Sequence, residues 1–504
     1  MNFATPLIAD HSVRSLLAKR ADETPDAPYL IDETGQTLTY READAGARSV
    51  AALIAAQGVQ PGQSVAYAMS NGIDAALVIL GALYGGYLTV AVNLVAGQET
   101  VSYVLDHSKS RLVLHDEGAK ELVTSALSGQ ETPPELLQIG PDAFIHSPIS
   151  YPDIAASADG LLMYTSGTTG RPKGVVLTHG NLLAGGANAV LAHVLTPDDR
   201  ALCVLPLYHI NGLCVSLLGS LVSGSSVVIP PKFRVSTFWE TVVETRCTWL
   251  SLVPTQISYL LHEVKLSEPP AGVRFARSAS APLSPDVQTA FEAAFGVPIV
   301  ETMGLTETAA QILSNPLPPG TRKIGSPGIA FGNEVVIADP LGQEMPPGEE
   351  GELLVRGPNV MREYLYNEKA TRDSLTSDGW LRSGDLGRMD ADGYVFITGR
   401  LKELIIKGGE NIAPREIDDA LYSHPDVIEA AAFALPCPHY GEKVEAGVVL
   451  TEGTDMDGAS LVAHCIAKIG SFKAPDHVHV FDALPKGPSG KIQRIKLAAQ
   501  VSRD

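Results

Sequence analysis

The densest group of phosphate-binding residue types is the stretch YTSGTTGRPKG at residues 164–174. Four Ser and Thr hydroxyls, three glycines, one arginine and one lysine fall within eleven residues. Small residues allow backbone amides to converge on an anion, hydroxyls add donors, and a cation screens the charge. The stretch therefore suits a phosphate group, although Gly and Thr also favour an ordinary polar turn.

Two widespread nucleotide motifs do not describe this stretch. A Walker loop needs GK followed by Ser or Thr, whereas Lys173 is preceded by Pro172 and followed by Gly174. A Rossmann glycine fingerprint is also missing from the sequence. A phosphate site here would be of another kind.

Six motifs in order make the chain resemble the adenylate-forming superfamily of acyl-CoA synthetases, nonribosomal adenylation domains and luciferases. YTSGTTGRPKG is followed by LPLYHINGL (205–213), MGLTE (303–307), WLRSGDLG (380–387), GRLKELIIKGGENIAPREID (399–418) and PKGPSGKI (485–492). The resemblance implies a reaction in two halves. A carboxylate attacks the α-phosphate of ATP to give an acyl-adenylate and pyrophosphate, and the thiol of coenzyme A then displaces AMP.

The resemblance also implies a nucleotide site. Its ATP and AMP contacts would be Thr165, Ser166, Gly167, Thr168, Thr169, Lys173, Met303, Gly304, Thr306, Asp385 and Arg400. Asp385 would accept hydrogen bonds from the ribose hydroxyls, and Arg400 would add a second ribose and phosphate contact. Met303 departs from the family, which usually has an aromatic residue packed on the adenine; methionine is flexible and polarisable enough to pack there instead.

The implied catalytic residues are Lys491, Glu307, Thr165 and His209. Glu307 corresponds to the family's Mg²⁺-binding glutamate, and an oxygen ligand combined with phosphates is normal for Mg²⁺. Lys491 corresponds to the lysine that bridges the carboxylate and the α-phosphate, a task that suits a mobile point charge. Outside the family context, Glu307 would be interpreted as a surface carboxylate and Lys491 as a solvated lysine of the tail.

Three further residues correspond to parts of the family that serve the second half-reaction. Lys402 occupies the hinge about which the small domain rotates. Gly408 and Gly409 match the stretch that lines the pantetheine tunnel, where side chains would block the thiol.

The acid pocket is predicted from the resemblance of two short segments. RFARSASAPLSPDV (274–287) and ETMGLTETAAQILSNPLPPG (301–320) are most similar to the branch that activates oxalate and other small acids. Arg277 is a candidate anchor for a second anionic group, because a bidentate guanidinium in a dry pocket holds a small dianion well; the alternative is a strand-end arginine in a surface ion pair. The pocket would comprise His209, Asn211, Arg277 and Ser280.

We therefore expect a compact, polar acid such as oxalate, malonate or a sulfonated analogue. The alternatives are a medium-chain or aryl acid CoA ligase, a stand-alone adenylation domain that loads a carrier protein, and a luciferase-like enzyme. A nucleotide-sensing pseudoenzyme is a further alternative, but it would be expected to lack Glu307 or Lys491, and both are present.

The elements that must position these residues follow an alternating pattern. Helical stretches such as 13–23 and 285–295 alternate with β-rich runs such as 111–116, 225–230 and 248–254, which predicts parallel sheets covered by helices. After Gly332, the runs NEVVIAD, EGELLVRG and GYVFITG are separated by turn residues and predict a mainly antiparallel portion.

A smaller unit is expected from residue 399 onward, with a helix from Pro414, two strands, a helix over 460–469 and a polar tail. The predicted fold class is α/β with an α+β C-terminal domain. Residues 1–398 would form the large ATP- and acid-binding domain, and residues 399–504 the small mobile domain that carries the catalytic lysine.

Two uncharged runs are long enough to be considered as membrane helices. Residues 75–97 combine an apolar helical half, the Gly85-Gly86 break and a β-prone half, which is typical of a buried helix that precedes a buried parallel strand. Residues 201–231 contain His209 and Asn211 beside prolines and glycines, which a lipid-facing helix rarely tolerates. Both runs are expected in the core, and no membrane insertion is predicted.

Composition limits the classes of function. With 504 residues, 45% of them hydrophobic and 19% charged, the chain can form two or more folded domains. A formal net charge of −20 argues against binding nucleic acid or an anionic membrane through a basic surface. Only −3 of this charge lies from residue 399 onward, where twelve Lys and Arg accompany fifteen Asp and Glu, so a phosphate-bearing ligand would meet less repulsion there.

The five cysteines, at 203, 214, 247, 437 and 465, form no CxxC pair and no metal-ligand spacing, so a disulfide framework is not expected. The N-terminal residues lack the pattern of a secretory signal, and the final VSRD is not a peroxisomal address. We expect a cytoplasmic monomer or homodimer whose ligands are ATP, Mg²⁺, coenzyme A and a small carboxylic acid.

Overall fold

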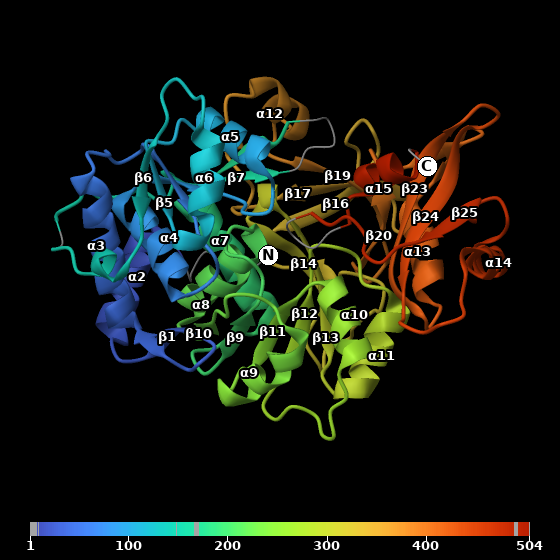
Figure 1. The fold of residues 1–504 in the computed structure, drawn as a ribbon, viewed down its shortest axis with the longest axis horizontal. Coiled ribbons are helices and arrows are strands. Elements are labelled where there is room, and N and C mark those ends of the chain that lie inside the picture. The colour runs from blue at the N-terminus through green and yellow to red at the C-terminus, as the bar shows by residue number, and fades with distance from the viewer. Residues whose placement is uncertain (1–7, 9, 148, 166–170, 488–491, 503–504) are drawn as a thin grey trace.

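The structure is a computed structural model that describes residues 8, 10–147, 149–165, 171–487 and 492–502. Figure 1 shows a large body of helices and sheets, with the C-terminal elements gathered at one end. Five predicted site residues, Ser166, Gly167, Thr168, Thr169 and Lys491, lie outside the described residues.

A seven-stranded sheet carries the phosphate-loop motif at the end of a hairpin. Its strands, in spatial order, are β18 (Glu363–Tyr364), β8 (Lys173–Thr178), β7 (Asp159–Thr165), β4 (Leu88–Ala91), β3 (Ser64–Ala68), β5 (Leu112–His115) and β6 (Glu135–Gln138). The run from β7 to β6 is parallel, whereas β8 pairs antiparallel with β7 and places Thr165 opposite Lys173. The two ends of the motif are therefore fixed side by side.

A nine-stranded sheet carries the acid-pocket and MGLTE segments. Its order is β15 (Ile329–Ala330), β14 (Ala310–Ser314), β13 (Ile299–Leu305), β12 (Phe275–Ser278), β11 (Trp249–Leu252), β9 (Arg200–Cys203), β10 (Ser226–Val228), β1 (Pro28–Ile31) and β2 (Thr37–Thr39). The strands from β13 to β1 are parallel, and β13 turns back into antiparallel β14. This turn holds Thr306 and Glu307.

The predicted antiparallel portion is confirmed as a four-stranded sheet. Its order is β16 (Glu334–Ala338), β17 (Glu350–Arg356), β19 (Leu381–Met389) and β20 (Val395–Arg400), with every pairing antiparallel. Asp385 on β19 lies opposite Arg400 on β20. β20 thus continues through Gly399 and Arg400, and the division between domains at residue 399 stays a prediction.

The C-terminal unit has a sheet of β22 (Glu410–Ile412), β21 (Ile405–Lys407), β24 (Gly441–Leu450), β23 (Val427–Cys437) and β25 (His477–Val480), with helices α13 (Pro414–Tyr422), α14 (Gly458–Ile469) and α15 (Arg494–Val501). The predicted helix from Pro414, the two strands and the second helix are confirmed. The prediction of a polar tail after this helix is wrong. Residues 477–480 pair in parallel with β24, and residues 494–501 form a helix whose Leu497 is fully buried.

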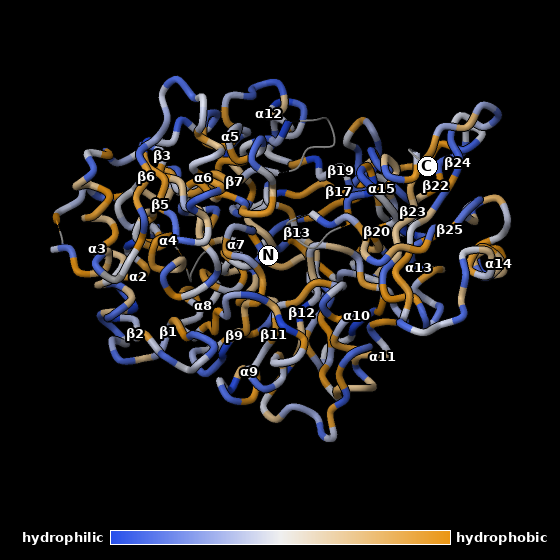
Figure 2. Tube along the Cα trace, viewed as in Figure 1, coloured by the Kyte–Doolittle hydropathy of each residue, from blue (hydrophilic) through white to orange (hydrophobic). Residues whose placement is uncertain are grey.

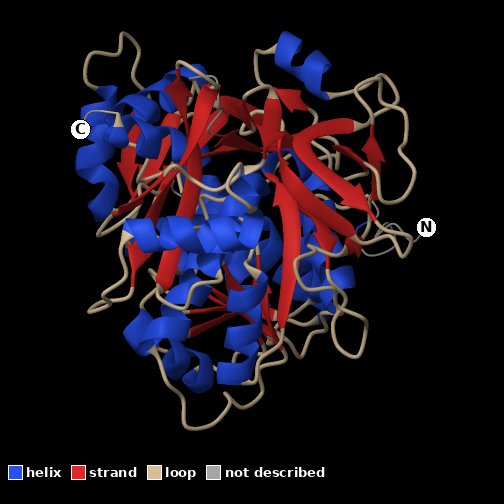
Figure 3. Cartoon of the chain, turned by 90° about the vertical axis from the view of Figure 1, so that its right-hand side faces the viewer, coloured by secondary structure: helices blue, strands red, loops and turns tan. Residues whose placement is uncertain are grey.

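Helices cover the two large sheets. They are α2 (Val13–Glu23), α3 (Tyr40–Ala56), α4 (Ile73–Gly85), α5 (Gln98–His107), α6 (Lys120–Leu127), α7 (His179–His193), α8 (Gly219–Ser223), α9 (Phe238–Glu244), α10 (Pro254–Glu263), α11 (Pro285–Phe295) and α12 (Glu368–Ser374), with a π-helical segment at Asn211–Leu218 and 3₁₀ turns at Glu117–Ala119, Pro141–Phe144, Val235–Thr237 and Thr306–Thr308. In the side view of Figure 3, helices lie between layers of strands.

The two uncharged runs are core segments, as predicted. The first forms α4 and β4, which are buried almost throughout, with Gly86 ending the helix in a left-handed conformation. The second forms β9, the π-helical segment, α8 and β10. Figure 2 shows apolar stretches along these interior elements and hydrophilic colour on outer loops. Within the described ranges, every helix is too short or too polar to cross a bilayer.

α7 is a central helix that needs a glycine where it meets the MGLTE turn. It contacts β7, β8, β14 and the π-helical segment. A Cβ on Gly185 would lie 2.0 Å from the carbonyl oxygen of Ala309, a contact that the backbone must move to relieve. The glycine therefore allows α7 to pack directly against the segment that follows Glu307.

We predict that Gly185→Ala lowers the free energy of unfolding by about 1–3 kcal/mol, the usual cost of overpacking a core. Gly219→Ala is the matched control, because it is also buried in a helix near α7 but its Cβ would meet nothing closer than 3.7 Å. Urea unfolding of both variants measures the difference. Equal stability of the two variants would contradict the packing argument.

Candidate active site

The phosphate-loop hairpin and the MGLTE turn meet through Tyr364 on β18. The Lys173 ammonium lies 3.8 Å from the centroid of the Tyr364 ring. The Tyr364 hydroxyl donates a 2.7 Å hydrogen bond to Glu307 Oε1, and the Glu307 carbonyl accepts one of 2.7 Å from the Met361 amide. Tyr364, which the sequence did not single out, thus holds the predicted phosphate-binding lysine and metal-binding glutamate in one place.

The charge of Lys173 is held close to other charges. Burial lowers the pKa of Lys173, the Glu307 carboxylate opposes this shift by favouring the ammonium, and Lys402 lowers the pKa further. Lys402, the predicted hinge residue, lies in the exposed turn after β20, close enough to Lys173 for their charges to interact. A half-buried cation with a second cation nearby is suited to a polyanionic ligand.

Asp385 and Arg400 form a bidentate pair across β19 and β20. Arg400 Nε lies 2.5 Å from Asp385 Oδ1, and Nη2 lies 3.2 Å from Oδ2. Burial disfavours the Arg400 charge, but the ion pair with Asp385 outweighs it and raises the pKa of Arg400. The two predicted ribose contacts are therefore adjacent and oriented by each other.

The β13–β14 hairpin explains the glycine of MGLTE. A Cβ on Gly304 would lie 1.7 Å from the carbonyl oxygen of Ala310, so a side chain cannot be accommodated. Met303 is half-buried against the apolar cluster beneath β14 and β16. Thr306 and Glu307 form the turn itself, which is closed by a 3.1 Å hydrogen bond from the Leu305 amide to Thr308 Oγ1.

The donor set for a metal is limited. Among the described residues, no three His, Cys, Asp or Glu side chains are grouped as a metal site. Glu307 therefore fits Mg²⁺ only as one carboxylate ligand beside nucleotide phosphates, which is how this ion is usually bound in such sites.

Arg277 lies inside the protein rather than in a surface ion pair, so that alternative is wrong. Its side chain is 1% exposed. Nε donates a 3.1 Å hydrogen bond to Gln311 Oε1 and Nη1 one of 2.6 Å to Asn211 Oδ1. Asn211 Nδ2 donates in turn to Ser280 Oγ at 3.3 Å. The structure thus joins three of the four predicted pocket residues.

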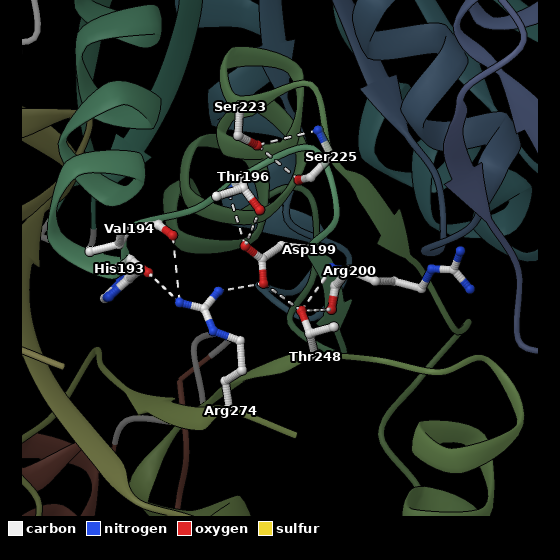
Figure 4. A network of polar contacts seen from close by, with 9 residues as sticks. All are labelled: His193, Val194, Thr196, Asp199, Arg200, Ser223, Ser225, Thr248 and Arg274. Atoms are coloured by element: carbon white, nitrogen blue, oxygen red, sulfur yellow. Dashed lines mark hydrogen bonds and ion pairs between the residues drawn. The ribbon is translucent and has the colours of Figure 1, made fainter. Parts of the chain in front are cut away.

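Arg277 has no carboxylate in salt-bridge contact among the described residues. Burial lowers its pKa to about 9, so the guanidinium is still charged at neutral pH. Its neighbour on the chain, Arg274, contrasts with it. Arg274 is 38% exposed and pairs with Asp199 at 2.5 Å, at the end of α7 (Figure 4).

Gln311 is a partner of Arg277 that the sequence analysis missed. It accepts from Arg277, lies 3.1 Å from His193 Nε2 and donates to the Asn188 carbonyl at 3.5 Å. The available signal was an amide side chain, one of two polar residues in the fully buried strand AQILS. A continuous polar chain consequently runs from His193 through Gln311, Arg277 and Asn211 to Ser280.

The pocket edge has an unusual backbone. Ser280 follows β12 with φ of +73° and is exposed, and a left-handed backbone at a non-glycine residue is often found at functional sites. His209 is half-buried, and its carbonyl accepts a 3.0 Å hydrogen bond from Leu213 in the π-helical segment that contains Asn211. His209 and Asn211 are therefore positioned by one short segment.

Gly408 and Gly409 form the turn between β21 and β22, with φ of +61° and +87°. Two-residue hairpin turns with both φ angles positive strongly favour glycine, so the turn by itself accounts for both residues. Their place in a thiol tunnel stays a prediction.

Comparison with known proteins shows both the family to which the chain belongs and the fold that it shares. The chain matches the model described as AMP-binding enzyme over residues 17–365 and the one described as AMP-binding enzyme C-terminal domain over residues 416–491. It is 46% identical to sulfoacetate–CoA ligase of Cupriavidus necator, with 99% of each chain covered. It is 35% identical to oxalate–CoA ligase of Arabidopsis thaliana, with 97% of this chain and 98% of that protein covered.

Solved structures add information on arrangement. ATP-bound MatB from Rhodopseudomonas palustris superposes with a TM-score of 0.89 at 30% identity, covering 97% of this chain and 99% of that one. The apo form of the same protein gives 0.77, with 98% and 99% covered. The present structure therefore resembles the ATP-bound arrangement more closely.

The polar chain has a consequence for stability in acid. Burial, together with the charge of Arg277, lowers the pKa of His193 to about 3, whereas an unfolded histidine has a pKa of about 6.5. The unfolded state therefore binds more protons between these values, so the stability due to neutral His193 is present above pH 6.5 and is lost as pH falls.

We predict that wild-type protein loses about 2 kcal/mol of unfolding free energy through His193 between pH 7 and pH 5. In His193→Gln this part of the loss should disappear, while His477→Gln, which changes an exposed side chain, should keep the wild-type pH dependence. Urea unfolding at both pH values gives the result. An unchanged pH dependence in His193→Gln would contradict the prediction.

Proposed function

Because the chain belongs to the AMP-binding enzyme family, we propose that it joins CoA to a small acid with a second anionic group, sulfoacetate being the first candidate. The chain is an ATP-dependent, AMP-forming acid–CoA ligase, since the family and its full-length CoA ligase relatives agree on this reaction. The motif resemblance is thereby confirmed. The identity of the acid is the part proposed.

The observation behind the acid is the Arg277 site. A buried guanidinium that lacks a carboxylate partner is costly unless a ligand supplies the negative charge. A sulfonate or second carboxylate would supply it, whereas an alkyl or aryl tail would not. The relatives with the names sulfoacetate–CoA ligase and oxalate–CoA ligase act on acids of this kind, which supports the same choice.

The remaining predicted residues are given the roles that the family resemblance implies. Lys173 and the backbone of the phosphate loop would hold the terminal phosphates, and Asp385 with Arg400 would hold the ribose. Glu307 would bind Mg²⁺, which when bound offsets phosphate charge. Lys491 would bridge the attacking carboxylate and the α-phosphate, a task for a cation where one anion attacks another.

The other proposed roles concern the second half-reaction, in which the CoA thiol displaces AMP. His209 would border the acid and the entry of the CoA thiol, Lys402 would serve as hinge, and Gly408 with Gly409 would line the thiol path. We also keep the division at residue 399, the cytoplasmic location and the monomeric or dimeric state as predictions.

The test is an AMP-formation assay with ATP, Mg²⁺ and CoA across a panel of acids. We expect sulfoacetate, oxalate or malonate to give the highest kcat/KM, with acetate, octanoate and benzoate well below them. If octanoate or benzoate exceeds every doubly anionic acid, the proposed substrate class is wrong while the ligase reaction stands.

Arg277→Met sharpens the same test. Loss of one partner of a buried charged hydrogen-bonded pair typically costs about 2–5 kcal/mol, so kcat/KM for the preferred dianion should fall by about 30-fold or more. The value for acetate should change little. Arg274→Met, at an exposed arginine three residues away, is the matched control; equal losses for both acids would remove Arg277 from the pocket.

A further inference from the structure

Arg415 on α13 links the C-terminal unit to the large unit. Its Nη1 donates a 2.9 Å hydrogen bond to the carbonyl of Ile397 on β20, and its Nη2 one of 3.4 Å to the carbonyl of Gly325. The side chain is 12% exposed. One guanidinium thus caps two backbone oxygens of the large unit from a helix of the small one.

A buried carboxylate lies on the other side of this interface. Glu301 on β13 is 2% exposed. Its Oε1 accepts a 3.2 Å hydrogen bond from the Leu283 amide, and its buried Oε2 has no hydrogen-bond partner among the described residues. Burial raises the pKa of Glu301, while the charge of Arg415 opposes that shift. Arg415 is therefore the cation that compensates an acid two residues before Met303.

The surroundings of Arg415 are otherwise acidic. Asp419, one turn along α13, lies 3.5 Å from Arg415 Nε. The pKa of Asp419 is raised to about 6, chiefly by burial; Asp418 and Asp286 also raise it, whereas Arg415 opposes the shift. Without the Arg415 guanidinium, Asp419 of α13 would face Asp286 and Glu301 of the large unit across a largely buried interface, with no cation of the described residues between them.

The other charges of α13 are compensated within the C-terminal unit. Glu416 pairs with Lys473 at 2.7 Å, and Asp418 pairs with Arg494 at 2.5 Å. Lys473 is thus a useful comparison, since it is a cation paired with the same helix that makes no hydrogen bond to the large unit among the described residues.

We propose that Arg415 is a positioning residue that holds the C-terminal unit against β20 in the arrangement described here, and so favours ATP binding and acyl-adenylate formation. Its two carbonyl contacts require α13 to lie against β20, and other placements of the unit would break them. The arrangement is the one that resembles ATP-bound rather than apo MatB. The effect on acyl-adenylate formation rests on the proposed function, whereas the effect on ATP binding does not.

Linkage makes the proposal measurable. A contact made in one arrangement shifts the population toward it, and a ligand that prefers this arrangement then binds more tightly. Removal of Arg415 should therefore weaken ATP binding even though the side chain is assigned no contact with ATP. Coupling between such sites commonly amounts to about 5- to 150-fold in affinity.

The first experiment is calorimetric titration of the full chain with ATP and Mg²⁺ in the absence of any acid. We expect Arg415→Met to raise the Kd for ATP by about fivefold or more, Arg415→Lys to recover part of the loss, and Lys473→Met to match wild type. Thermal unfolding confirms that each variant is folded. Wild-type affinity in folded Arg415→Met overturns the proposal.

The second experiment separates the two half-reactions with the best acid of the panel. ATP–pyrophosphate exchange should fall by about tenfold in Arg415→Met, whereas CoA thiolysis of supplied acyl-adenylate should remain within about twofold of wild type. Equal losses in both steps overturn the positioning role. If wild-type protein binds ATP but forms no adenylate with any acid, the proposed function fails, and the ATP titration still decides the role of Arg415.

Discussion

The burial of a single positive charge without a matching carboxylate is the constraint that organises the predicted acid pocket. Arg277 is held by the side-chain oxygens of Asn211 and Gln311, which are dipoles rather than charges. Neutral acceptors orient a guanidinium but do not cancel its charge. The structure therefore keeps an uncompensated positive side chain inside the large unit of a chain whose net charge is −20.

Charge pairing distinguishes the predicted nucleotide site from the predicted acid pocket. In the predicted nucleotide site, two cations have a nearby opposite charge: Arg400 has Asp385, and Lys173 has Glu307. These pairs orient each other, and a triphosphate with its metal adds charge of both signs. In the predicted acid pocket, Arg277 has no carboxylate partner among the described side chains, and under the proposed function a dianion would supply that negative charge.

Much of the framework could be predicted because local patterns determine it. The hydrophobic run 75–97 formed a buried helix and strand around Gly86, and the runs after Gly332 formed an antiparallel sheet. The polar tail was misjudged because the burial of Leu497 and the pairing of 477–480 with β24 depend on tertiary packing. Short segments of mixed polarity carry little periodic signal.

The site was predicted by motif and only partly by physics. The roles of Tyr364 and Gln311 were not predicted because their partners are distant in sequence. Tyr364 lies 57 residues from Glu307, and Gln311 lies 34 residues from Arg277. A polar residue in a buried strand indicates a hydrogen-bond partner but does not identify it. The burial of Arg277 likewise depends on the packing of β12 between β11 and β13, which the sequence of β12 alone does not reveal.

Under the proposed function, specificity would follow from what the predicted pocket excludes as much as from what it attracts. Among the described residues, hydrogen bonds to Gln311 and Asn211 engage two of the five N–H groups of Arg277. A dianion can accept from others, whereas an apolar acyl chain would leave buried donors unpaired, at a cost of about 1–3 kcal/mol for each such group. Sites built in this way reject ligands that lack the required polar group far more strongly than apolar pockets reject an extra methylene. If the proposed acid binds here, the polar chain from His193 to Ser280 would act as a filter against alkyl acids, and buried Gln311 and Asn211 would fix where the second anionic group lies.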